Sequence, residues 1–150
     1  MKLRDVRDRK DLVKVTDLKE QVIADFRANS GWVGGPYEGA RIILVHDRGA
    51  KTGRERVTPM TYFPQVDGSM VVVASNRGAD RNPAWYHNLM AHPRVVVEVG
   101  AETFEVDATE IVGAAREAVW AAIAAELPAV DDYRERASRT IPLVRLERAH

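Results

Sequence analysis

The polar turn from residue 47 to residue 56 carries the densest set of groups that could bind an anion. Gly49 and Gly53 would let the backbone approach a ligand closely, and exposed amides with Lys and Arg side chains form a cradle for phosphate or carboxylate groups. A solvated, charged hairpin would have the same composition, so both interpretations stay open. The cations of this turn lie within nine residues and are Arg48, Lys51, Arg54 and Arg56.

A second group of candidate binding residues follows the apolar run at residues 70–74. The run ends in small and polar residues from Ser75 onward, and a loop then leads to a helix start at Pro83. Helix starts attract anions because their first backbone amides are unpaired and the helix dipole is positive there. Trp85 and Tyr86 add aromatic faces. A helix cap followed by a core aromatic would look alike, so this segment also allows two interpretations.

Other site chemistries find no support in the sequence. His87 and His92 are five residues apart and lack the helical spacing and carboxylate partner of a metal site, so no metal is predicted. No serine lies in a Gly-x-Ser-x-Gly setting, and the carboxylates show no paired arrangement for glycoside chemistry. The chain has no cysteine, which excludes thiol nucleophiles and thiolate metal sites. The residues alone indicate an anion-binding fold with aromatic walls and do not name a reaction.

Composition limits the class of protein. The 150 residues make one domain, with 22 Lys and Arg against 22 Asp and Glu. Because nucleic-acid binders usually carry a basic excess, no nucleic-acid partner is expected. The charged N-terminus has no apolar stretch behind it and is not a signal peptide, and no run approaches the length of a membrane span. These features predict a soluble protein of the cytoplasm, with no stable membrane insertion.

The apolar pattern predicts the elements that would position these groups. A helix is expected to begin near Asp17, because Asp17 and Glu20 form a capping-box pattern, and to end at Gly31. Asp67 and Gly68 are typical of a hairpin turn. Strands are expected at residues 41–46, 57–63, 70–74, 94–99, 102–108 and 141–147, and further helices at residues 83–91, 113–127 and 131–138.

Six short strands with helices as inserts and flanks favour an antiparallel barrel decorated with helices. The order is not the regular strand–helix alternation of a Rossmann fold, and no Gly-x-Gly-x-x-Gly follows a strand, so a standard nicotinamide site is not predicted. We expect a charged arm at residues 1–16 and one domain at residues 17–150.

Four stretches of the chain follow one another in an order and at a spacing that are specific together, although each is weak alone. Together they resemble the deazaflavin (F420)-dependent nitroreductase family, from about residue 17 to residue 148. The matching family patterns are Gly-Arg-Lys-Ser/Thr-Gly-x-x-Arg-x-x-Pro at residues 49–59, Val-Ala-Ser-x-Gly-Gly at 73–78, the segments 82–89 and 92–93, and the C-terminal signature at 132–133 and 139–142.

The resemblance implies an α+β, mainly β fold: a split antiparallel β-barrel of about six strands with flanking helices, like the FMN-binding split barrels. It also implies that Lys51, Thr52 and Arg56 hold the phosphate and glutamate tail of coenzyme F420, and that Tyr133 orients an acceptor or relays a proton. The residues implied to bind the coenzyme are Ala50, Lys51, Thr52, Gly53, Arg56, Val57, Thr58, Pro59, Met60, Val73, Ala74, Ser75, Asn76, Arg77, Ala84, Trp85, Tyr86, His87 and Asn88.

The function implied by the resemblance is hydride transfer from the reduced deazaflavin to a small organic acceptor, such as a quinone, an activated alkene or a nitro compound. The alternatives are a split barrel that binds FMN or haem, and a protein that carries the deazaflavin without turnover. A homodimer is compatible with the resemblance. The chain departs from the family pattern at Ala50, where Arg is common, and at Asn76-Arg77, where Lys or Gly is common.

Overall fold

The structure, a computed structural model, describes the backbone of residues 9–35 and 39–150 and the side chains from residue 18 onward within these ranges. Its elements run in the order α1 (Arg9–Ala28), β1 (Ile42–Arg48), β2 (Glu55–Thr61), β3 (Phe63–Pro64), β4 (Met70–Val73), the 3-10 turn η3 (Asn76–Gly78), α2 (Ala84–Ala91), β5 (Arg94–Val99), β6 (Glu102–Glu110), α3 (Ala114–Glu126), α4 (Ala129–Arg136) and β7 (Leu143–Arg148).

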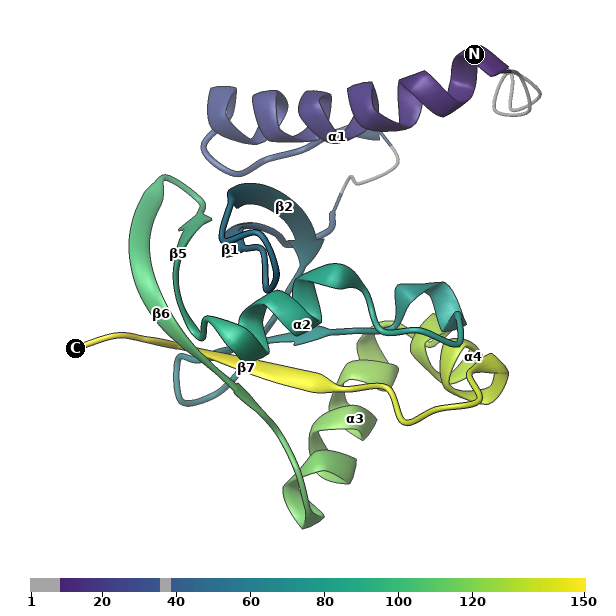
Figure 1. Cartoon of the computed structure of the whole chain (residues 1–150). Coiled ribbons are helices and arrows are strands. Elements are labelled where there is room, and N and C mark those ends of the chain that lie inside the picture. The colour runs from purple at the N-terminus through teal and green to yellow at the C-terminus, as the bar shows by residue number, and fades with distance from the viewer. Residues whose placement is uncertain (1–8, 36–38) are drawn as a thin grey trace.

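In the described residues the strands form one antiparallel sheet of seven strands, in the order β2-β1-β5-β6-β7-β4-β3. The sheet curls into an open half-barrel whose free edges are β2 and β3. Figure 1 shows α1 on one side next to β1 and β2, α3 and α4 on the opposite side, and α2 between them. The expected mainly β, split-barrel architecture with flanking helices is confirmed.

The period of two along the strands divides the core between two faces of the sheet. On β1, Ile43 and Val45 point into the half-barrel, where Leu89 of α2 covers them. Ile42 and Leu44 point the other way and pack against Phe26 of α1. The strand pattern therefore explains why α1 and α2 lie on opposite faces of β1.

The third part of the core lies beneath α3 and α4. Val71 of β4 and Leu143 of β7 face away from the half-barrel and pack against Trp120 and Ile123 of α3 and Val130 of α4. This packing fixes α4 beside the end of β4, where the loop containing η3 begins. No helix in the described part of the chain is long and apolar enough to cross a lipid bilayer.

The predicted start of the first helix at Asp17 is wrong. Helix α1 spans Arg9–Ala28, so Asp17 lies in its interior. The stretch from residue 9 to residue 28 contains no glycine or proline that would interrupt a helix, and an Asp-x-x-Glu pattern is also tolerated inside one. Residues 9–16 of the expected arm are therefore helical, and residues 1–8 lie outside the described residues.

The predicted strand at residues 57–63 is two strands. Strand β2 pairs with β1 from Glu55 to Thr61, and the chain then crosses to the other end of the sheet, where Phe63 pairs with Val71. At the crossing, the Tyr62 amide donates to the Arg41 carbonyl at 2.9 Å. A single apolar run cannot reveal this change of partner.

The remaining boundaries differ by a few residues, for local reasons. Strand β1 continues through Arg48, so the turn is shorter than expected and spans residues 49–54. Pro83 and Pro128 precede α2 and α4 as their N-terminal caps, so α4 starts at Ala129 rather than near residue 131. The turn at Asp67 and Gly68 is confirmed as the hairpin between β3 and β4, with Gly68 at φ 88°.

Candidate functional site

Two hollows lie on either side of the start of α2, and strand β2 contributes to both. The first, named here the cationic hollow, has a volume of about 530 Å³ and is lined by Gly49, Ala50, Lys51, Thr52, Arg54, Glu55, Arg56, Ala84, His87 and Asn88. The second, the aromatic cleft, has a volume of about 380 Å³ and is lined by Pro59, Met60, Thr61, Phe63, Val73, Ser75, Asn76, Arg77, Pro83, Trp85, Leu127, Val130 and Tyr133.

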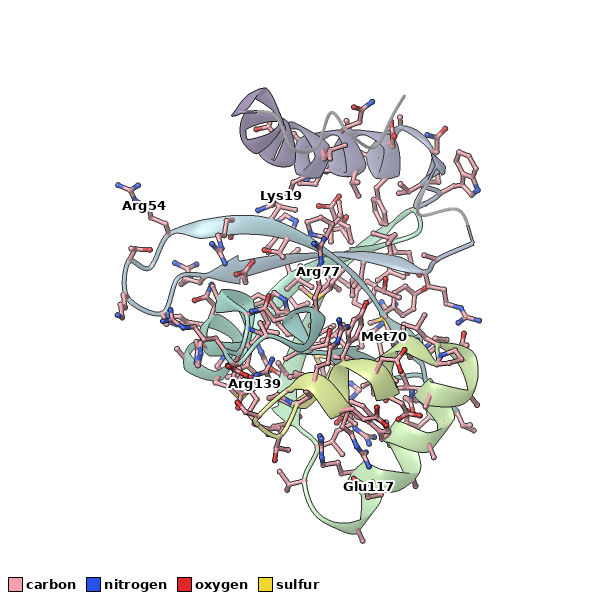
Figure 2. All side chains as sticks on the ribbon, turned by 90° about the vertical axis from the view of Figure 1, so that its right-hand side faces the viewer. Lys19, Arg54, Met70, Arg77, Glu117 and Arg139 are labelled. Carbon is pink, nitrogen blue, oxygen red and sulfur yellow. The ribbon has the colours of Figure 1, made fainter. Side chains whose placement is uncertain are left out.

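The cationic hollow is built on the turn between β1 and β2. The Gly49 amide donates to the Arg54 carbonyl at 2.8 Å, and the Gly53 amide donates to the Gly49 carbonyl at 2.8 Å. A Cβ at residue 49 would lie 2.4 Å from the Thr52 hydroxyl oxygen, so a larger residue there would displace the Thr52 side chain. The turn carries Arg54 at its tip, projecting from the body of the molecule (Figure 2).

The backbone amides of this turn are unequally available to a ligand. The Ala50 amide already donates to the Asn88 side-chain oxygen at 2.9 Å. In the part of the chain that the structure describes, the amides of Lys51 and Thr52 have no acceptor. The two free amides, together with the side chains of Lys51, Arg54 and Arg56, can therefore bind an anion.

A buried carboxylate, Asp47, binds several of the residues that surround the cationic hollow. It is fully buried and accepts hydrogen bonds from the Thr58 hydroxyl at 2.6 Å, from the Asn88 side-chain amide at 2.7 Å and from Nε of Arg56 at 3.2 Å. Asn88 in turn holds the Ala50 amide. Asp47 therefore joins β1, β2, α2 and the turn, and it fixes the direction of the Arg56 side chain.

The aromatic cleft lies between β2, the start of α2 and helix α4. Trp85 of α2 and Met60 of β2 supply apolar wall, and Tyr133 of α4 brings a hydroxyl. Cavities of a few hundred cubic ångströms with mostly apolar walls and a few polar groups are typical ligand sites. The cleft can therefore hold a flat, weakly polar group.

One wall of the aromatic cleft is the loop from residue 74 to residue 82, which Arg139 holds in place (Figure 2). Its guanidinium donates to the carbonyl oxygens of Ser75 at 3.0 Å, Ala79 at 2.9 Å and Ala74 at 3.3 Å, and to the Asn82 side chain. Burial lowers the pKa of Arg139 below that of a free arginine. The loop is therefore held by Arg139 from beyond α4, together with the Ser138 hydroxyl, which donates to Asp80 at 2.7 Å.

Most of the residues that the sequence singled out are brought together by the structure. Pro59, Met60, Val73, Ser75, Asn76, Arg77, Trp85 and Tyr133 line the aromatic cleft, and Ala50, Lys51, Thr52, Arg56, Ala84, His87 and Asn88 line the cationic hollow. The candidates that line neither are Gly53, Val57, Thr58, Ala74 and Tyr86.

The candidates outside both hollows have other neighbours. Val57 packs against the core beneath α1, and Ala74 is fully buried. The Tyr86 hydroxyl donates to Glu110 of β6, away from the cleft. This hydrogen bond, together with burial, raises the pKa of Tyr86 to about 12, so its proton stays bound at ordinary pH.

Sequence reasoning missed several lining residues and their main support. Thr61 and Phe63 follow Pro59 at a spacing of two, and all three line the aromatic cleft. Pro83 lines the cleft just before α2. Asp47 was assigned to the turn, although a carboxylate directly after an apolar strand is a signal of a buried polar contact.

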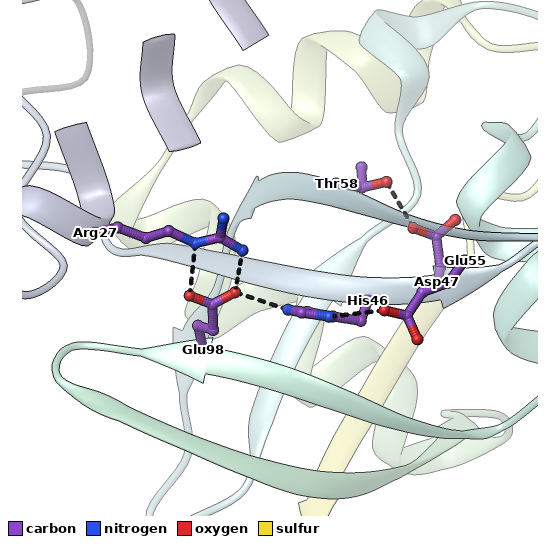
Figure 3. Close-up of polar contacts among 6 residues, drawn as sticks. All are labelled: Arg27, His46, Asp47, Glu55, Thr58 and Glu98. Carbon is purple, nitrogen blue, oxygen red and sulfur yellow. Dashed lines mark hydrogen bonds and ion pairs between the residues drawn. The ribbon is translucent and has the colours of Figure 1, made fainter. Parts of the chain in front are cut away.

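A separate polar cluster attaches α1 to the sheet. Arg27 binds Glu98 of β5 through two hydrogen bonds of 3.0 and 2.7 Å. His46 of β1 lies between Glu98, 2.7 Å from its Nε2, and Glu55, 3.2 Å from its Nδ1 (Figure 3). The hydrogen bond from Arg27, followed by that from His46, lowers the pKa of Glu98.

This cluster predicts an acid-sensitive attachment of α1. Because folding keeps Glu98 ionised at lower pH than in the unfolded chain, its contribution is present above the ordinary glutamate pKa of 4.5 and is lost as pH falls below it. We expect Glu98→Gln to lower stability by about 1 kcal/mol at pH 7 and to make little difference near pH 3. Urea unfolding of both proteins across this pH range measures the effect. An equal difference in the free energy of unfolding at pH 3 and at pH 7 would contradict the prediction.

Comparison with known proteins assigns the chain to a family. A model of the F420H(2)-dependent quinone reductase family matches residues 18–148. The chain belongs to this family. It is similar to an F420H(2)-dependent quinone reductase of Mycobacterium tuberculosis, with 40% identity over 89 residues. That match covers 59% of this chain and 59% of the relative, so it spans less than two thirds of the relative's length.

Two solved structures agree with the family assignment. One is described as an F420-H2 dependent reductase; it is 31% identical, has a TM-score of 0.64, and matches 71% of this chain and 94% of its own. The other is described as a domain-swapped dimer; it is 27% identical, has a TM-score of 0.67, and matches 89% of this chain and 98% of its own. Family members and the first of these structures are thus named for deazaflavin-dependent reduction.

Proposed function

We propose that this chain is a reductase that binds reduced coenzyme F420 and transfers a hydride from it to a quinone. The observation that carries the proposal is the pairing of a hollow with several cations and a cleft with aromatic side chains across the start of α2. A ligand with an anionic tail and a flat, weakly polar ring matches this pair, and the family name supports the same coenzyme.

The residues present fit the coenzyme. The hollow has three cationic side chains, Lys51, Arg54 and Arg56, against the single carboxylate of Glu55, and Glu55 also contacts His46. Phosphate and carboxylate groups of the tail would be bound by these cations and by the free amides of the turn. The aromatic cleft also has polar side chains that could form hydrogen bonds with the ring carbonyls of the coenzyme. Among them are Ser75, Asn76 and Tyr133.

The roles of the protein groups follow from their positions. When bound, the reduced coenzyme supplies a hydride, and the protein positions an acceptor against it and limits access of water. Trp85 and Met60 provide apolar contact for the stacked rings. Tyr133 lies on the α4 side of the cleft, where its hydroxyl can orient a quinone oxygen or pass a proton to it. Two-electron reduction of the quinone gives a hydroquinone.

We expect Lys51→Ala and Arg56→Ala each to weaken coenzyme binding by roughly ten- to a hundredfold, because each removes one charged hydrogen bond to an anion. Rising salt should weaken binding to the wild type, since these contacts are close to solvent. Arg94→Ala is the matched control, because Arg94 pairs with Asp107 outside both hollows. Fluorescence titration measures the dissociation constants, and values equal to the control in both variants would exclude the turn from the site.

The function itself is tested by two measurements on the wild type. Titration with the reduced deazaflavin and with FMN shows which ring system the protein binds. Addition of menadione to the complex shows whether the bound coenzyme is oxidised. Tight binding of FMN alone would overturn the coenzyme assignment, and tight deazaflavin binding without oxidation would indicate a carrier.

A homodimer stays a prediction for this chain. It is supported by the related structure that is described as a domain-swapped dimer.

A further inference from the structure

Of the described residues that line the aromatic cleft, Arg77 is the one that carries a charge. The cationic hollow, which would bind the anionic tail, is a separate space on the other side of α2 and has its own cations. The charge of Arg77 is therefore placed where the coenzyme ring and the acceptor would lie, and not where the tail would lie.

The backbone at Arg77 adopts a conformation that favours glycine. Its φ is 57° and its ψ is 27°, in the left-handed region, and a residue with a side chain is uncommon there. The family pattern has glycine or lysine in this segment. Arginine is retained at a position where its side chain brings backbone strain, and such strained residues cluster at ligand sites.

The surroundings of Arg77 hold it in one place beside Tyr133. The Gly78 amide donates to the Ser75 carbonyl at 2.8 Å, and Arg139 binds the same carbonyl from outside. The loop also packs closely on α4, because a Cβ at Gly78 would lie 3.2 Å from the Tyr133 carbonyl oxygen. The backbone of Arg77 is thus held next to α4, which carries Tyr133, and both residues line the cleft.

The guanidinium of Arg77 is available to a ligand. Among the side chains that the structure describes, no carboxylate lies within ion-pairing distance of it. Its neighbour Arg139 is committed to backbone carbonyls and to Asn82. An arginine fork in a cleft with apolar walls binds a carboxylate through two parallel hydrogen bonds.

We propose that Arg77 selects an acceptor that carries a carboxylate on a short chain attached to an apolar quinone ring. The ring contacts Trp85 and Leu127, and the carboxylate binds Arg77. The quinone takes up a hydride from the reduced coenzyme and a proton from water and becomes a hydroquinone; the coenzyme is left oxidised, and the carboxylate does not react. The proposal rests on the proposed function.

The test compares a 2-methyl-1,4-naphthoquinone bearing a propanoate chain at position 3 with its methyl ester, which has the same ring and differs in charge. The variant is Arg77→Asn, because asparagine tolerates the left-handed backbone. Arg81→Asn is the matched control: it removes the same charge from the same loop, at a residue that does not line the cleft. Dissociation constants for the coenzyme are measured for all three proteins.

We expect the wild type to show a kcat/KM for the acid roughly tenfold or more above that for the ester, as one charged hydrogen-bonded pair would give. The preference should reside mostly in KM and decrease with salt. Arg77→Asn should lose it and Arg81→Asn should keep it, with each protein assayed at saturating coenzyme. An equal preference in wild type and Arg77→Asn overturns the proposal, as does weaker coenzyme binding in Arg77→Asn with an unchanged acid-to-ester ratio.

Calorimetric binding of the acid and of the ester to the coenzyme-free protein separates this proposal from the proposed function. Tighter, Arg77-dependent binding of the acid without any turnover would reject the reductase function and leave the anion selectivity of the cleft standing. Equal binding of acid and ester to the wild type would overturn the selectivity, whether or not the protein oxidises the coenzyme.

Discussion

Replacing Asp47 with alanine is expected to destabilise the protein by about 3 kcal/mol, because hydrogen bonds to a charged group contribute about 1.5–3 kcal/mol and several are lost together. The Thr58 hydroxyl and the Asn88 side-chain N–H would lose their acceptor beneath the turn, and Arg56 would lose its carboxylate. For a chain of this size the loss corresponds to a melting temperature lower by about 6–12 °C.

Calorimetry or thermal circular dichroism measures this change. Asp107→Ala is the control, because it also removes a carboxylate that binds an arginine, but one whose side chain is 48% exposed, so a loss below about 1 kcal/mol is expected. Asp47→Asn keeps the shape of the side chain and part of its hydrogen bonding, so its melting temperature should lie between those of Asp47→Ala and Asp107→Ala. If Asp47→Ala had the same melting temperature as Asp107→Ala, the hydrogen bonds of the buried carboxylate would not stabilise this region.

Replacing Arg139 with methionine is expected to open the wall of the aromatic cleft and to weaken coenzyme binding at least tenfold. The methionine chain keeps part of the apolar volume but cannot donate to the carbonyls of Ser75 and Ala79. The Ser75 carbonyl keeps the Gly78 amide as a donor, and Ala79 is exposed to solvent. A loss of stability of about 1–2 kcal/mol should therefore accompany the weaker binding.

Two further variants make this result specific. Arg139→Lys keeps the charge but not the planar fork, so it should recover only part of the loss. Arg94→Met removes an exposed arginine from β5 and should leave coenzyme affinity unchanged. Urea unfolding and coenzyme titration on the same samples measure both effects. Coenzyme affinity in Arg139→Met equal to that in Arg94→Met would mean that the loop keeps its shape without the Arg139 guanidinium.

The strands and most helices could be predicted because their signals are local. The apolar runs at residues 42–45 and 70–73 arise because both faces of these strands are covered by the core. The start of α1 could not be predicted from Asp17, because a capping pattern does not show whether the residues before it are already helical. The split of the strand near Tyr62 depends on Arg41 and Val71, which are distant in sequence.

The residues of the candidate site also divide into those with a local signal in the sequence and those that depend on distant partners. Lys51, Arg56 and Trp85 were predicted from motifs, and the structure places each of them in a hollow. Tyr86 was implied by the same family segment as Trp85. Successive residues of a helix point in different directions, and the Tyr86 hydroxyl donates to Glu110. Asp47 and Arg139 act through partners 41 and 64 residues away in the chain, and a single sequence gives no sign of such pairs.

The half-barrel leaves two strand edges open, and both carry proline. Pro59 lies within β2 opposite Leu44, and β3 is only two residues long and ends at Pro64. Since proline has no N–H, the Pro59 nitrogen can face the outer edge without loss to the ladder. An open edge is normally a template for the strand of another molecule and a starting point for ordered aggregation. Pro59 also lines the aromatic cleft, so one residue contributes to the candidate site and makes the edge of the sheet a poor template for self-assembly.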